Sequence, residues 1–151
     1  MSKYLLNYKL KFVGLPLLIL SFFLAIIRFY FGIKPNIFDT KVFAIYSYYF
    51  EKKYFVVIEN HISEEIAGVL ALTGLFLVAF SKEKNENDKI VSLRNNSMKL
   101  SFIANYIFLI LSFVFVYGFA FLDIMIINIF SQLVFFIIIF RISVLINNRK
   151  T

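Results

Sequence analysis

The sequence predicts an all-α membrane protein: a four-transmembrane-helix bundle with a short extracytoplasmic β-hairpin between the first two helices. Of its 151 residues, 61% are hydrophobic and only 17% are charged, which is far more apolar than a soluble domain. The apolar residues gather in four blocks, and about 20 helical residues are enough to cross about 30 Å of hydrocarbon. Lysines and arginines lie mostly at the ends of these blocks. We therefore expect a single transmembrane domain over residues 1–151.

The first block predicts a transmembrane helix at about 12–32. Lysines precede it, as in a secretory signal, but the block is too long for the apolar part of a signal and lacks a small-residue cleavage site. Pro16 lies near the helix start, where its missing amide hydrogen costs least. Arg28 lies near the far end, from which its charge can reach the interface. We therefore interpret this block as a retained helix.

A β-hairpin is predicted at about 41–60. Two runs of β-branched and aromatic residues, Val42–Phe50 and Tyr54–Ile58, flank the polar triplet Glu51-Lys52-Lys53. Neither run alternates cleanly between apolar and polar residues, so we expect neither face of the hairpin to be fully exposed to water. The hairpin would then lie on the bilayer surface or against the helix ends. An interfacial helix over the same residues is the alternative.

The second helix is predicted at about 64–81. Ser63 and the two acids that follow it suit the amides and the dipole of a helix start. Ala67, Ala71 and Gly74 recur at spacings of four and three residues, so these small side chains share one face. Membrane helices approach each other closely along such faces. We expect this stripe to pack against another helix.

The membrane-spanning parts of the last two helices are predicted at about 98–118 and 124–146, after a cytoplasmic loop at 82–97 and around a tight reversal at 118–123. Ile90, Leu93 and Ser97 share a helical face, so the third helix should begin early, around Asp88. In the fourth helix, one face carries the uncharged polar residues Asn128, Ser131 and Gln132. This membrane polar face is expected to bond to neighbouring helices, and the alternative is that it lines a polar path or a partner surface.

Charge asymmetry predicts the orientation. Lysine and arginine are concentrated in the N-terminal segment (three), the stretch Ser81–Lys99 (five) and the C-terminal tail (two), against four between Lys34 and Lys53. Positive charge favours the cytoplasmic side, so both termini are expected in the cytoplasm of a bacterial inner membrane. The basic residues are dispersed and form no dense run, so we expect no nucleic acid as a partner.

The sequence contains few residues that could serve in catalysis or metal binding. The chain has no cysteine and one histidine, which excludes disulfides, thiol catalysis, thiolate metal sites and a two-histidine haem site within one chain. One metal-like cluster remains, formed by Glu59, His61, Glu64 and Glu65. Acids are ordinary at a helix start, so we expect no metal, no cofactor and no enzymatic activity. The four apolar blocks also lack the buried acid that a small proton-coupled multidrug exporter needs.

Several short segments resemble an uncharacterised family of small bacterial four-helix integral membrane proteins. These segments are Lys41–Tyr46, Tyr54-Phe55, Ile62–Ile66, Phe80–Lys84 and Tyr117-Gly118, and the similarity spans residues 30–146. The resemblance implies the fold and topology but no catalytic residues, because no activity is established for that family. It also implies a regulatory or sensory pairing, since such genes often neighbour small helix-turn-helix regulators. The stretch Glu86–Ile90 departs from a more acidic family segment.

We therefore expect a non-catalytic polytopic membrane protein, an accessory, sensory or regulatory subunit that acts through membrane or cytoplasmic protein partners. The alternative is a transport element for a small solute or ion that acts as a homo-oligomer within the lipid bilayer.

Overall fold

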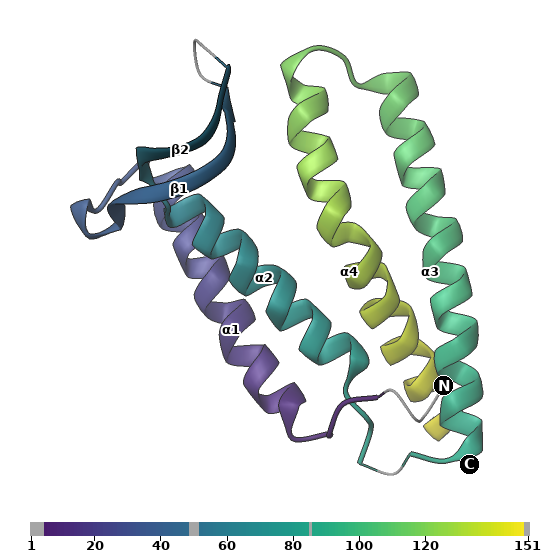
Figure 1. Cartoon of the computed structure of the whole chain (residues 1–151). Coiled ribbons are helices and arrows are strands. Elements are labelled where there is room, and N and C mark those ends of the chain that lie inside the picture. Colours follow the sequence, from purple (N-terminus) through teal and green to yellow (C-terminus); the bar gives the residue numbers. More distant parts are fainter. Residues whose placement is uncertain (1–4, 49–51, 85, 150–151) are drawn as a thin grey trace. The chain divides into compact units, whose positions relative to one another are not determined.

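The computed structural model describes residues 5–48, 52–84 and 86–149 (Figure 1). Within these residues, four helices are long and apolar enough to cross a membrane, and two strands form a small antiparallel hairpin. The predicted class, four helices and a hairpin, is therefore confirmed. Internal contacts divide the chain into two compact units, Met1–Leu17 with Leu72–Thr151, and Leu18–Ala71.

The unit Leu18–Ala71 contains the end of the first helix, the hairpin and the beginning of the second helix. Its elements are α1 (Leu10–Ala25), the π-helical turn η2 (Ile26–Tyr30), the 3-10 turn η3 (Asn36–Phe38), β1 (Asp39–Tyr48), β2 (Lys52–His61) and α2 (Ser63–Phe80). Together, α1 and η2 form a span of 21 residues, which begins at Leu10 and ends at Tyr30 rather than at 12 and 32. Gly32 follows with φ +64, a conformation that glycine adopts without strain.

Strands β1 and β2 pair in a regular antiparallel register, from Asp39 opposite His61 to Tyr48 opposite Lys52. The predicted hairpin is thus confirmed, and the alternative of an interfacial helix is wrong. Glu51 of the predicted polar break lies outside the described residues, whereas Lys52 already belongs to β2. Pairing is interrupted where Phe55 has φ +50, a left-handed conformation that is rare for a bulky side chain.

The second unit is built around two long helices, α3 (Asp88–Phe115) and α4 (Phe119–Arg149), which pack side by side (Figure 1). The side chain of Asn87 accepts a hydrogen bond of 2.9 Å from the amide of Ile90 and caps α3, so the predicted start around Asp88 is confirmed. The predicted reversal at 118–123 is too long. Gly118, with φ +68, turns the chain, and α4 begins at the next residue because helical geometry satisfies its backbone groups.

The core of this unit lies where α2 ends. Ala79, Phe136 and Phe140 are buried together, with Ile90 and Leu93 packed against them. The N-terminal segment joins the same region through backbone hydrogen bonds of Leu6, whose amide donates to Phe80 and whose carbonyl accepts from Lys82, both at 3.0 Å. This arrangement brings the segments around residues 6, 81, 94 and 140 together.

Candidate functional site

A buried arginine organises the polar end of the unit that contains α3 and α4. Arg94, on α3, is only 3% exposed. Its guanidinium donates to the carbonyl oxygens of Ala79 and Ser81, at 3.1 and 3.3 Å, and to Glu86 Oε2 at 3.2 Å. It also lies 4.5 Å from the centre of the Phe140 ring, within the range of a cation–π interaction. A single side chain therefore binds the end of α2, the following loop, and α4.

Glu83 extends this arrangement. Its carboxylate accepts a hydrogen bond of 2.8 Å from Lys11 and lies 3.5 Å from Arg141 Nη1, while its backbone amide donates to Glu86 Oε2 at 2.7 Å. The three cations and two acids form what we call the Arg94 network: Lys11, Glu83, Glu86, Arg94 and Arg141. The network connects Glu83 and Glu86, which follow α2, to α1, α3 and α4.

Sequence reasoning missed the role of Arg94, which it counted among the dispersed positive charges of the loop. A signal was present, because Arg94 lies four residues from Ile90 and three from Ser97, on the helical face that these residues share. By contrast, the lysines of the same region lie on the surface. The exposed ones are Lys82, Lys84, Lys89 and Lys99.

The predicted polar face of α4 lies against α3. Gln132 donates to Ser101 Oγ at 3.1 Å, and Asn128 lies 3.5 Å from Asn105 Oδ1, which also accepts a short hydrogen bond from Ser131. Ser97 and Ser143 lie 3.4 Å apart further along the same interface. We call this set the α3–α4 polar row, in which Asn105 and Ser101 are the partners on α3. One buried atom of the row, Gln132 Oε1, has no hydrogen-bond partner.

The small residues of α2 are partly enclosed. Ala67 and Gly74 are buried, and Ala71 is half-buried. The closest approach involves a residue that the sequence did not single out: a Cβ atom on Gly14 of α1 would lie 2.9 Å from the carbonyl oxygen of Gly74 and 3.0 Å from Leu77 Cβ. Gly14 and Gly74 thus permit backbone contact between these parts of α1 and α2.

The four residues of the metal-like cluster do not converge. Each instead has its own partner: Glu59 with Lys41 (3.7 Å), Glu64 with Arg28 (2.5 Å), Glu65 with Asn60 (3.1 Å), and His61 with both Pro35 O (3.2 Å) and Ser63 Oγ (2.9 Å). Among the described residues, no group of three or more acids or histidines is placed to hold a metal ion. Both imidazole nitrogens of His61 are already engaged in hydrogen bonds.

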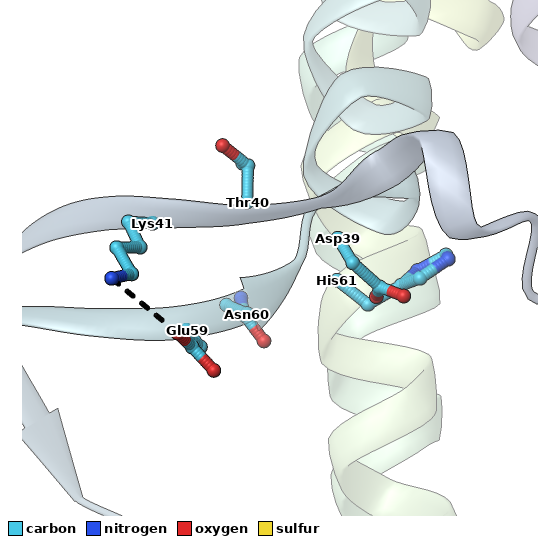
Figure 2. Close-up of a pocket in the computed structure, with 6 residues that line it drawn as sticks. All are labelled: Asp39, Thr40, Lys41, Glu59, Asn60 and His61. Carbon is cyan, nitrogen blue, oxygen red and sulfur yellow. Dashed lines mark ion pairs between the residues drawn. The ribbon is translucent and has the colours of Figure 1, made fainter.

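Figure 2 shows the open hollow beside this region, with a volume of about 980 Å³. Lys41 of β1 and Glu59 of β2 point toward each other, while Asp39 and His61 lie together at the base of the hairpin. Thr40 and Asn60 complete the lining. The walls are therefore an exposed ion pair and polar groups at the ends of the strands.

In the part of the chain that the structure describes, four helices are long and apolar enough to cross a membrane, which indicates a multi-pass membrane protein. No protein-family model matches the chain, and no curated protein or solved structure matches it either. The resemblance to the small bacterial family remains a prediction.

Proposed function

We propose that this chain is a non-catalytic accessory, sensory or regulatory subunit of a bacterial inner membrane, with both termini in the cytoplasm. In this proposal it acts through a protein partner that binds the loop between α2 and α3. The observation that carries the proposal is the sorting of charge in and around that loop. Glu83 and Glu86 bind inward to the Arg94 network, and the lysines nearby are exposed.

This sorting gives the loop a basic outer surface on a fixed frame. Lys82, Lys84 and Lys89 are exposed, whereas the nearby Glu83 carboxylate accepts from Lys11. A surface that is already ordered loses little conformational entropy when it binds. Its positive charge suits an acidic face on a partner and would increase the rate of encounter.

Affinity capture from gently solubilised membranes tests this proposal. The double variant Lys84→Glu/Lys89→Glu should lose a stoichiometric partner protein that the native chain retains, because it reverses charge on the proposed surface. The matched control, Lys41→Glu/Lys53→Glu, makes the same charge change on the hairpin and should retain the partner. If both variants lose it equally, or if the native chain captures none, the proposed surface is wrong.

Orientation is tested separately with single cysteines, since the chain has none of its own. We expect a cysteine at position 52 to react with an impermeant reagent in intact cells. Cysteines at positions 84 and 148 should react only after the membrane is opened. The reverse pattern would place the basic loop outside and would exclude a cytoplasmic partner.

A second candidate function is a transport element that acts as a homo-oligomer. The α3–α4 polar row favours it, because polar groups at membrane depth often mark solute or ion paths and Gln132 Oε1 is buried without a partner. In that case, the solubilised protein should be a homo-oligomer without a second protein. Gln132→Leu should then reduce solute flux in proteoliposomes without changing the oligomeric state.

A further inference from the structure

The hairpin exposes a broad apolar surface. Six large apolar or aromatic residues of its described part are more than half exposed: Phe43, Ile45, Tyr46, Tyr54, Phe55 and Val57. Four of them share one face, because side chains alternate along a strand and the register places residue 43 opposite residue 57. We call Phe43, Ile45, Phe55 and Val57 the hairpin apolar face. The opposite face lines an open hollow that also contains Glu65 of α2, so it is turned toward the helix start.

We propose that the hairpin apolar face lies in the headgroup region of the same bilayer that the helices cross, with lipid as its occupant. The attachment of the hairpin supports this position. β2 ends at His61 and α2 begins at Ser63, and the intervening Ile62 donates a 3.0 Å hydrogen bond to Phe38 O. In Figure 1 the two strands cross beside the start of α2 and then bend away from it. A hairpin attached in this way stays at the membrane surface.

The unpaired edges of the hairpin limit how deeply it can enter the bilayer. The sheet has only two strands, so each strand has an outer edge of backbone N–H and C=O groups without a neighbouring strand. Hydrocarbon excludes such edges because nothing there can bond to them. The headgroup layer is hydrated and also accommodates aromatic rings, including those of Tyr46 and Tyr54. Lys52 and Lys53, at the distal end, place positive charge where lipid phosphates lie.

Full exposure to water is the less favourable position. A lone two-stranded hairpin is marginally stable in water, and contiguous exposed apolar surfaces usually mark an interaction. Phe55 adds a local observation: it holds a left-handed backbone conformation while its ring, 72% exposed, lies 6.4 Å from that of Phe43. Strained conformations persist where the surroundings hold them, and contact of this ring pair with lipid supplies such surroundings.

Depth-dependent fluorescence quenching tests the proposal on the full chain in lipid nanodiscs. Phe55→Trp and, independently, Phe43→Trp each introduce the only tryptophan of the chain. The lipids carry bromine either near the glycerol backbone or near the end of the acyl chain. Ile107→Trp, at an exposed position in the middle of the apolar part of α3, is the reference for a residue in hydrocarbon.

We expect shallow bromine to quench the hairpin tryptophans more strongly than deep bromine, and deep bromine to quench the tryptophan at position 107 more strongly. Strong quenching by aqueous acrylamide with none by either lipid would overturn the proposal and leave the face open to a soluble partner. No quenching by lipid or by acrylamide would also overturn it, because the face would then be covered by protein. Two hairpin positions guard against a variant that fails to fold.

Discussion

Removal of the Arg94 guanidinium should be among the most damaging single changes in the chain. Arg94→Met keeps much of the side-chain volume and its contact with the Phe140 ring but removes all three hydrogen bonds. The carbonyl oxygens of Ala79 and Ser81 then lose a donor, and Glu86 loses its counter-charge. Loss of one partner of a buried ion pair typically costs about 3–5 kcal/mol. We expect a decrease of that size in the free energy of unfolding.

Arg141→Met is the matched control. It makes the same substitution in the same network, but the Arg141 side chain is 43% exposed, and its 3.5 Å contact with Glu83 is backed by the shorter one from Lys11. Exposed ion pairs contribute about 0–1 kcal/mol, so this variant should remain close to the native chain. Arg94→Lys should fall between the two, because one ammonium group cannot reproduce the fork of a guanidinium.

Reversible unfolding in mixed detergent micelles, followed by circular dichroism, would measure these differences. A double variant adds a test of mechanism: Arg94→Met with Glu86→Gln should cost less than the sum of the single changes, because it leaves no unpaired carboxylate. Equal losses for Arg94→Met and Arg141→Met would refute the reasoning. So would a loss of less than about 1 kcal/mol for Arg94→Met, since the guanidinium would then contribute no more than an exposed ion pair.

Three other outcomes follow from the contacts described above. Gly14→Ala should destabilise the fold by about 1–3 kcal/mol in the same unfolding assay, because its new methyl group would lie 2.9 Å from the carbonyl oxygen of Gly74. The control Gly68→Ala, with open space around it, should be neutral or slightly stabilising. Asn105→Leu should cost more than Gln132→Leu, about 1–2 against about 0.6 kcal/mol, since Asn105 accepts from two residues of α4. Chelators should leave the melting temperature unchanged, and a chelator effect that His61→Ala abolishes would contradict this.

Local sequence patterns predicted the elements of this fold because each depends on neighbouring residues. Block length determines the four helices, and the β-branched and aromatic runs determine the hairpin. The early start of α3 followed from a helical face that continues through Ile90 and Leu93 before the apolar block. The start of α4 at Phe119 was missed because one glycine, Gly118, makes the reversal that the sequence assigned to six residues.

The parts that sequence did not predict depend on partners that are distant along the chain. Lys11 is 72 residues from Glu83, and Gln132 is 31 residues from Ser101. The helical spacing of Ile90, Arg94 and Ser97 could have separated Arg94 from the exposed lysines, but nothing local indicates the partners that it binds, the carbonyl oxygens of Ala79 and Ser81 and the carboxylate of Glu86. Gly14 was not singled out for a similar reason. Its lack of a side chain matters because the backbone of Gly74 lies opposite it.

The chain has a net charge of +7, but its surface charge depends on which charged side chains are exposed and which are paired inside the protein. Each of the five described glutamates has a polar partner within the protein, and they are Glu59, Glu64, Glu65, Glu83 and Glu86. The lysines of the loop, in contrast, are exposed. Salt screens exposed charges over about 8 Å at physiological strength but weakens buried pairs much less. If the proposed acidic partner binds the loop, added salt should therefore release it at concentrations that leave the Arg94 network, and the fold it stabilises, intact.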